Sequence, residues 1–270
     1  MDSIRDTFNR LRAARRKALI PFIMGGDPSL SLTGPLLLAL QDAGADLIEV
    51  GVPFSDPLAD GPVIQAASAR ALAHGTTPAG VLRAIAAVRP RLHVPVVCLS
   101  YWNPVAQFSP NGAGLSPQPF LRAAHDSGVA GVIVPDVPLE EGDPLRTAAR
   151  RESLAAVFMA APTSPPERLR MIARASEGFI YYVSVTGTTG MRRQLPATLL
   201  HGVRQLKLLT TKPVCVGFGI STPSQAASVA RVADGVIVGS AMVHAITAAK
   251  GRTAAVRRAA AFVTQLRAAV

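Results

Sequence analysis

The feature that most constrains this chain is a repeated alternation of short apolar runs with longer helical patterns. The short runs are rich in β-branched residues, and helical patterns fill the intervals between them. Continuous apolar runs of this kind are typical of parallel strands that are buried on both faces of a sheet. The predicted strands span residues 19–24, 47–52, 94–100, 131–134, 154–159, 179–184, 214–217 and 235–238.

Helical segments separate these strands, and no linker or low-complexity stretch divides the chain. The predicted helices span residues 2–16, 33–43, 63–73, 79–88, 118–127, 142–151, 165–175, 196–208, 222–231, 240–249 and 252–268. Eight predicted strands that alternate with helices fit an α/β fold of the (β/α)8 TIM-barrel type. We expect a single barrel domain over residues 1–270, with residues 1–17 as an extra N-terminal helix packed on it. A doubly wound open sheet is the alternative, although no G-x-G-x-x-G motif follows the first strand.

The chain is strongly basic, with a formal net charge of +11. Basic residues gather near both ends of the chain, in helical patterns that contain alanine and few aromatic residues. No RNA- or DNA-binding motif accompanies them, so we predict no nucleic-acid partner. The positive field would instead attract an anionic substrate or partner.

Cysteine use and hydropathy bear on the compartment. Cys98 and Cys215 both lie in apolar runs, which predicts buried, unpaired thiols and a cytoplasmic protein. No stretch is apolar and helical for long enough to span a membrane. The N-terminus carries Asp2 and Asp6 and has no apolar core of a secretory signal. We therefore expect neither membrane association nor secretion.

The segment GADLIEVGVPFSDPLADGPVIQ, residues 44–65, carries the strongest chemical signal. Glu49 stands in the middle of an apolar strand, where a carboxylate is costly unless it is paired or functional. Alternation along the strand separates two faces, with Leu47, Glu49 and Gly51 on one and Ile48 and Val50 on the other. Glu49 is therefore expected to point into the barrel, with a structural ion pair as its alternative role.

Asp60 lies on the loop that follows this strand and is free to approach the same cavity. Active sites of TIM barrels lie at the carboxyl ends of the strands, where both acids are expected. Two carboxylates in different surroundings suit acid–base chemistry, because the surroundings separate their pKa values. Asp136 also follows a strand, but capping of a turn or of the next helix is an equal alternative for it.

Two glycine-containing loops predict a phosphate site. GFGIS at residues 217–221 and VGSA at residues 238–241 each lie between a strand and a helix start. Helix N-termini offer free N–H groups to an anion, and the loops after strands seven and eight commonly bind phosphate in these barrels. Neither loop contains Lys or Arg, so we expect backbone amides and Ser240 to bind the anion. Gly187 and Gly190 would add a third wall, and tight turns without a ligand are the alternative.

The loop SVTGTTGMRR, residues 184–193, is long, glycine-punctuated and rich in hydroxyl groups, which is typical of a lid over substrate. A plain surface loop is the alternative. None of the five histidines lies at the carboxyl end of a predicted strand, and their spacing suggests no metal site. We therefore predict no metal, no cofactor and no histidine-driven mechanism.

These motifs resemble the tryptophan synthase alpha subunit family over nearly the whole chain. The resemblance is carried by LIPFIMGGDP from Leu19, GVPFSDPLADGPVIQ from Gly51, GVIVPDVP from Gly131, CVGFGIS from Cys215 and ADGVIVGSA from Ala233. The second of these is the most specific. The resemblance implies a (β/α)8 lyase that cleaves indole-3-glycerol phosphate by a retro-aldol step to indole and glyceraldehyde 3-phosphate.

The resemblance also implies roles for individual residues and a partner. It assigns catalysis to Glu49 and Asp60, phosphate binding to Gly190, Gly219, Gly239 and Ser240, lining of the indole pocket to Phe22 and Tyr181, and positioning of Asp60 to Thr189. The implied partner is a tryptophan synthase beta subunit, in an alpha2-beta2 heterotetramer that uses the indole to make tryptophan.

The chain departs from the family pattern at two places. Val185 stands where the family often has an arginine in the lid, which affects how the lid is ordered. The segment 105–118 is longer than usual, in the region where the family meets its beta subunit. Residues 92–121 contain no Lys, Arg, Asp or Glu, and depletion of charge suits the core of an interface. We hypothesise that this face docks a partner, with a partly buried strand and a neutral loop as the alternative.

Other functions compete with the paired-subunit function. One is a free-standing indole-3-glycerol-phosphate lyase that releases indole. Another is a different phosphate-binding barrel, such as an isomerase, and a third is a non-catalytic phosphate-binding barrel. The lack of a lysine at a strand end argues against a Schiff-base aldolase. The intact acid pair and glycine loops argue against a non-catalytic protein.

Overall fold

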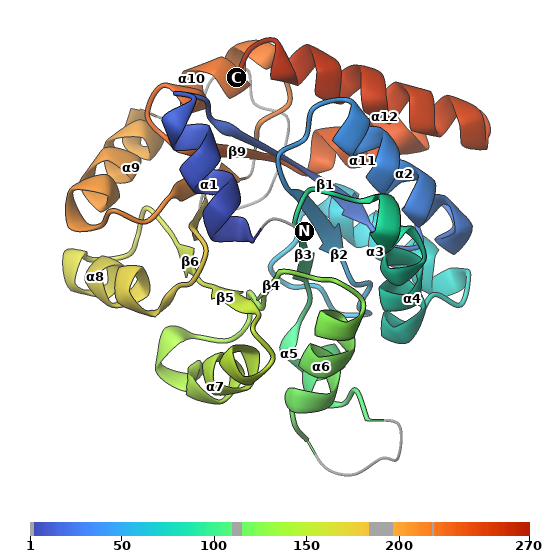
Figure 1. Ribbon diagram of the computed structural model, residues 1–270, viewed down its shortest axis with the longest axis horizontal. Coiled ribbons are helices and arrows are strands. Elements are labelled where there is room, and N and C mark those ends of the chain that lie inside the picture. The colour runs from blue at the N-terminus through green and yellow to red at the C-terminus, as the bar shows by residue number, and fades with distance from the viewer. Residues whose placement is uncertain (1–2, 110–114, 184–196, 218) are drawn as a thin grey trace.

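The computed structural model describes residues 3–109, 115–183, 197–217 and 219–270. The described strands form one parallel sheet in the order β5-β4-β3-β2-β1-β9-β8-β7-β6, and helices surround it (Figure 1). The strands are β1 (Ala18–Met24), β2 (Ile48–Gly51), β3 (Val96–Leu99), β4 (Gly131–Ile133), β5 (Ala155–Val157), β6 (Met159–Ala160), β7 (Ile180–Val183), β8 (Val214–Gly217) and β9 (Gly235–Val238).

The predicted strand 154–159 is interrupted at Phe158, which separates β5 from β6. The N–H of Phe158 donates to Oγ of Ser176 at 2.9 Å, and its carbonyl accepts from the N–H of Tyr181 at 3.1 Å. β5 pairs with β4 and β6 pairs with β7, so the chain itself closes the ring at this point. The predicted (β/α)8 barrel is confirmed, and the open sheet is wrong.

The helices lie close to the predicted positions. They are α1 (Ile4–Ala13), α2 (Leu30–Asp42), α3 (Pro62–Ala73), α4 (Pro78–Val88), η1 (Arg89–Arg91), α5 (Trp102–Ala106), α6 (Gln118–Asp126), η2 (Leu139–Glu141), α7 (Asp143–Arg151), α8 (Pro166–Ala175), α9 (Ala197–Leu209), α10 (Pro223–Ala230), α11 (Ser240–Thr247) and α12 (Arg252–Arg267). Several begin at proline, which suits the first helical position because no N–H is needed there. The short helix α5 was not predicted, because Pro104 lies inside it.

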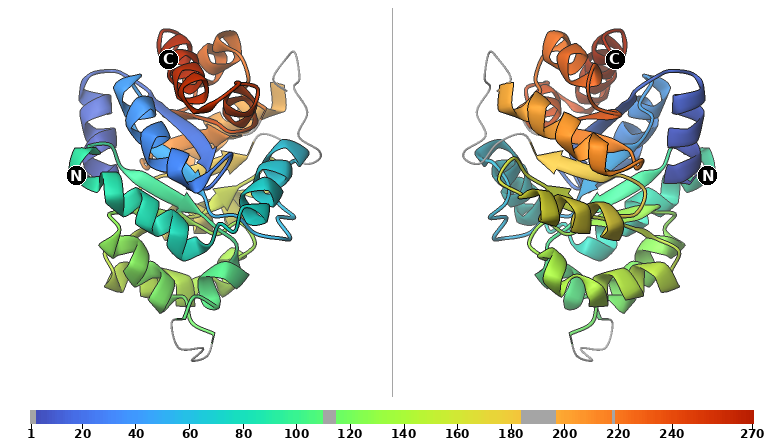
Figure 2. Two further views of the ribbon diagram at one scale, coloured as in Figure 1. Left: turned by 90° about the vertical axis from the view of Figure 1, so that its right-hand side faces the viewer. Right: turned by 90° about the vertical axis from the view of Figure 1, so that its left-hand side faces the viewer.

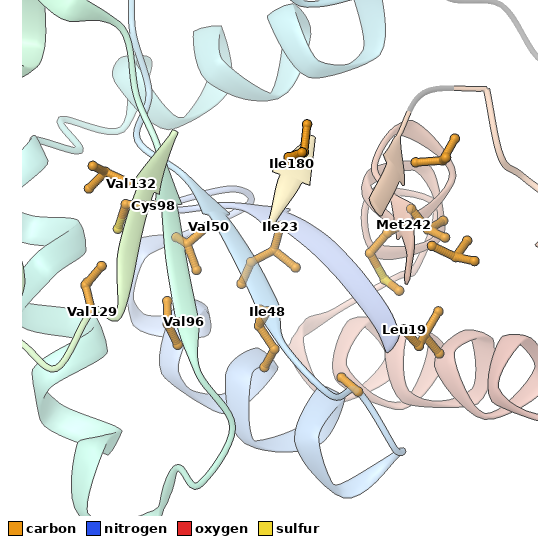
Figure 3. Packing of buried hydrophobic residues seen from close by; sticks show 14 of the residues in the cluster. Leu19, Ile23, Ile48, Val50, Val96, Cys98, Val129, Val132, Ile180 and Met242 are labelled. Carbon is orange, nitrogen blue, oxygen red and sulfur yellow. The ribbon is translucent and has the colours of Figure 1, made fainter. Parts of the chain in front are cut away.

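The strands separate two apolar clusters, as the alternation predicts. Ile48, Val50, Val96 and Cys98 belong to the cluster between the strands and the outer helices (Figure 3). Leu47 belongs to the second cluster, which fills the barrel interior. Cys98 and Cys215 are both buried and unpaired, as predicted. Of the helices within the described ranges, none combines the length and apolarity needed to cross a bilayer.

Helix α1 closes the amino-terminal end of the barrel, as the side views show (Figure 2). Ile4, Phe8 and Leu11 are buried and belong to the interior cluster. The ring of Phe8 lies 6.0 Å from the ring of Phe179, which directly precedes β7. Apolar side chains of α1 therefore fill the barrel interior at this end.

Candidate active site

A cavity of about 260 Å³ lies at the carboxyl ends of the strands. Its described lining is Phe22, Glu49, Asp60, Val63, Ile64, Leu99, Tyr181, Gly219, Ile220, Ser221, Ile237, Gly239, Ser240, Ala241 and His244. Both predicted acids, both predicted aromatic residues and three of the four predicted phosphate-binding residues therefore meet in one place. Thr189 and Gly190 lie outside the described residues, as do Val185, Gly187 and the whole predicted lid.

Glu49 lies in the interior of the barrel at the centre of β2, opposite Phe22 on β1 and Val97 on β3. It is 1% exposed, and within the described residues neither carboxylate oxygen has a hydrogen-bond partner. Burial raises the pKa of Glu49 to about 8, and the nearby charge of Asp60 adds to the shift. Glu49 therefore keeps its proton at neutral pH and can donate it. The ion pair considered as its alternative role does not occur within the described residues.

Asp60 reaches the same cavity from the loop between β2 and α3. Its N–H donates to the carbonyl of Pro57 at 3.0 Å, and its carbonyl accepts from Nε2 of Gln65 at 2.9 Å. Burial raises the pKa of its carboxyl group to about 6, while a hydrogen bond from Tyr101 opposes the shift. At neutral pH the two acids thus differ in protonation, with Asp60 mostly ionised and Glu49 mostly neutral.

Tyr101 is a residue to which sequence reasoning assigned no role. Its hydroxyl accepts from the N–H of Ala59 at 3.0 Å and hydrogen-bonds the carboxylate of Asp60. Its ring packs on Phe54 with 5.3 Å between the ring centroids. Tyr101, which follows β3, therefore contacts the Asp60 loop near its start, at Phe54, and near its end, at Ala59 and Asp60. The only signal for this role was that Tyr101 follows the strand next to β2. The local sequence pattern does not predict the order of the strands.

The aromatic walls of the cavity depend on two glycines. Phe22 and Tyr181 point into the cavity from β1 and β7, with Ile64, Leu99 and Ile237 as further apolar lining. A Cβ atom on Gly51 would lie 2.7 Å from Cζ of Phe22, and one on Gly217 would collide with the hydroxyl of Tyr181. These glycines leave room for the two rings, and the result is a mostly apolar cavity wall that suits an aromatic ligand.

The predicted phosphate end lies at the start of α11. Gly239 is the N-cap residue, and the N–H groups of Ser240 and Ala241 begin the helix, where no intrahelical partner exists. A Cβ atom on Gly239 would meet no atom closer than 4.0 Å, so the space beside it is open. Gly219 has φ +76°, a left-handed conformation that glycine adopts without strain. These groups form a concave surface of N–H donors and one hydroxyl.

The neighbouring helix α10 is capped by its own side chains. Thr222 accepts from the N–H of Gln225 at 3.3 Å, and the amide oxygen of Gln225 accepts from the N–H of Thr222 at 3.2 Å. This reciprocal cap satisfies the first donors of the helix. The loop after β8 therefore lines the cavity through Gly219, Ile220 and Ser221, while the open helix N-terminus is that of α11.

Asp136 lies away from the cavity and acts as a helix cap. Its carboxylate oxygens accept from the N–H of Trp102, the first residue of α5, at 2.9 and 3.1 Å. The helix that it caps follows β3 rather than its own strand. Across the described ranges, no group of three or more His, Cys, Asp or Glu side chains is placed to hold a metal ion.

Comparisons with known proteins agree with one another. The family model for the tryptophan synthase alpha chain matches residues 8–270. The alpha chain of Gloeobacter violaceus is 51% identical over 243 residues, which cover 90% of this chain and 86% of that protein. The alpha chain of Geobacter sulfurreducens is 46% identical over 273 residues and covers 100% of this chain and 99% of its own length.

Solved structures show the same relationship. Tryptophan synthase of Mycobacterium tuberculosis superposes with a TM-score of 0.87 at 36% identity, with 100% of this chain and 99% of that chain covered. The alpha subunit of Legionella pneumophila strain Paris gives a TM-score of 0.88 at 35% identity, with 100% and 98% covered. Sequence, fold and cavity thus lead to one conclusion: this chain belongs to the tryptophan synthase alpha chain family.

Proposed function

We propose that Glu49 and Asp60 are the two catalytic acids with which this chain carries out the reaction of its family. That reaction is the cleavage of indole-3-glycerol phosphate, a carbon–carbon lyase reaction. The observation that carries the assignment is the pair of carboxyl groups in one cavity, with pKa values raised to about 8 and about 6. Surroundings that separate two acids in this way give them different protonation states at neutral pH.

In the first step, Glu49 donates its proton to the indole carbon that bears the glycerol chain. The ring then carries a positive charge, which it shares with its N–H group. Asp60, whose ionised form is favoured by the hydrogen bond from Tyr101, stabilises this charge, or it accepts the ring proton and returns it when the carbon–carbon bond breaks. Because the cavity is apolar around both groups, the attraction between ring and carboxylate is stronger than it would be in water.

In the second step, the carboxylate of Glu49 removes the proton from the hydroxyl group on the adjacent glycerol carbon. The carbon–carbon bond breaks, its electrons restore the aromatic indole, and the glycerol carbon becomes the aldehyde carbonyl. Glu49 regains its proton and is ready for the next turnover. A single residue serves as acid and then as base, which a pKa near the working pH allows.

The remaining predicted residues would hold the two ends of the substrate. Phe22 and Tyr181 line the slot for the indole ring, and Gly219, Gly239 and Ser240 receive the phosphate at the start of α11. Thr189 and Gly190, which the family resemblance assigns to Asp60 and to the phosphate, stay predictions. We expect no cofactor, because both proton transfers are within reach of the two acids.

We further propose that the chain works with a beta subunit in an alpha2-beta2 heterotetramer in the cytoplasm. The similar Mycobacterium tuberculosis structures are of tryptophan synthase. In this chain, a hollow of about 610 Å³ lies between residues 103–109 of the charge-free segment, residues 77–79 at the start of α4, and Phe54 from the Asp60 loop. A partner seated there would touch the loop that carries Asp60. The family membership gives no support to an isomerase or to a non-catalytic barrel.

The test is the release of indole from indole-3-glycerol phosphate by the purified chain, with and without a beta subunit. Glu49→Gln should lower turnover by about 10³- to 10⁴-fold, because it removes both proton transfers. Substrate binding should change little, because glutamine keeps the shape of the side chain. Substantial turnover by Glu49→Gln would remove Glu49 from the mechanism. Release that ignores an added beta subunit would instead favour a free-standing lyase.

A further inference from the structure

His244 lies on the wall of the active-site cavity, one helical turn beyond Ser240 on α11. Residues four apart on a helix share a face, and helical side chains lean toward the helix N-terminus. The exposed side chain of His244 therefore covers the first turn of α11, where Gly239 and Ser240 border the proposed phosphate site. Its position suits contact with the anionic end of a ligand rather than with the indole slot.

The charges of the cavity make this position unusual. Among the described residues that line it, His244 carries the only basic side chain, whereas Glu49 and Asp60 are acids. A phosphate monoester carries between one and two negative charges at neutral pH. An imidazole ring donates an N–H hydrogen bond in its neutral form as well as in its protonated form. His244 is thus the one side chain besides Ser240 that can donate to the phosphate from the described part of α11.

Among the described residues, the imidazole makes no hydrogen bond or ion pair. The carbonyl of His244 accepts from the N–H of Ala248 at 3.0 Å and from Oγ1 of Thr247 at 3.4 Å. These bonds belong to the helix and leave the ring free to turn. The ring therefore has no partner in the described part of the chain that would compete with a ligand.

We propose that the imidazole of His244 donates a hydrogen bond to the substrate phosphate and sets the affinity for it. This inference rests on the proposed function, since it needs a phosphate at the start of α11. His244 contacts the substrate far from the bond that breaks, so it affects binding of the ground state and the transition state equally. Its removal should raise KM and leave kcat unchanged.

The experiment compares His244→Leu, which has no donor, with His244→Lys, which restores a donor. The readouts are KM and kcat for indole-3-glycerol phosphate, the inhibition constant of glyceraldehyde 3-phosphate and the Kd of indole. His244→Leu should raise KM and the inhibition constant about three- to fivefold, as for loss of an exposed charged contact. The Kd of indole, which lacks a phosphate, should not change. His244→Lys should restore both constants.

The matched control is His201→Leu, an exposed histidine on α9 that does not line the cavity. It should leave all four constants unchanged. If the wild-type chain is active and His244→Leu has the same KM and inhibition constant as the wild type, the inference about His244 is wrong, while the proposed function stands. Equal weakening of indole and of glyceraldehyde 3-phosphate would also overturn it, because the effect would then be one of cavity shape. A wild-type chain that releases no indole would overturn the proposed function, and this inference with it.

Discussion

The two ends of the barrel differ in how their interiors are filled, although the same strands form both. At the amino-terminal end, Ile4, Phe8 and Leu11 of α1 fill the interior with apolar side chains. At the carboxyl end, the interior stays open and contains two acids, one of them fully buried without a hydrogen-bond partner in the described residues. Burial of an acid opposes folding, whereas burial of apolar surface favours it. The closed end thus stabilises the fold. At the open end, burial of the two acids destabilises the fold and raises their pKa values.

Damage to the closed end should have the largest effect on stability. Phe8→Ala should lower the free energy of unfolding by about 3–5 kcal/mol, because it leaves a cavity beside Phe179. Chemical denaturation measures this loss. At a temperature where the variant is still folded, kcat/KM should stay close to that of the wild type, since Phe8 lies far from the acids.

Asn9→Ala is the matched control for Phe8→Ala, because Asn9 is the exposed neighbour on the same helix. It should change stability by less than about 0.5 kcal/mol. A large loss of kcat/KM in folded Phe8→Ala would mean that the two ends are coupled and that the division of roles is wrong.

Glu49→Gln should show the reverse behaviour at the open end, with a gain in stability and a loss of activity. The unfolded chain releases the Glu49 proton near the ordinary value of 4.5, but the folded chain keeps it up to about pH 8. The folded state therefore binds more protons in this window, and the wild type loses stability as the pH rises through it. At pH 8, Glu49→Gln should be more stable than the wild type by about 2–4 kcal/mol.

Denaturant unfolding of both proteins at pH 5 and at pH 8 measures this difference, which should be small at pH 5. Glu167→Gln, at an exposed position on α8, controls for the loss of one carboxylate. If Glu49→Gln were destabilised at pH 8, Glu49 would have a favourable partner in the folded protein. Burial of Glu49 would then not destabilise the folded protein.

Tyr101→Phe offers the finest test, because it changes one atom beside the open end. It removes the hydroxyl that accepts from Ala59 and bonds Asp60, so stability should fall by about 1 kcal/mol. The same hydroxyl lowers the pKa of Asp60, so its removal should raise that pKa and move the acidic limb of the pH–kcat/KM profile to higher pH. Tyr182→Phe, on the outer face of the same barrel, should leave the profile in place.

The sequence alone predicted the barrel and most of the cavity wall. Alternation in β2 predicted that Glu49 faces the interior, because the side-chain period of a strand is a local property. The glycine loops predicted two open helix starts; that of α11 has no side-chain cap, whereas that of α10 is capped by Thr222 and Gln225. The family resemblance supplied Phe22 and Tyr181, which line the cavity together with the acids.

The way these local elements meet depends on contacts between segments that lie far apart in the sequence. The break of the fifth strand at Phe158, the cap that Asp136 provides for α5 and the bond between Tyr101 and Asp60 each join segments from different βα units. The place of His244 on the cavity wall likewise depends on how α11 packs against α3 and β1. Such contacts follow from the order and register of the strands around the ring. A local pattern contains the period of each strand and helix, but not which of them become neighbours.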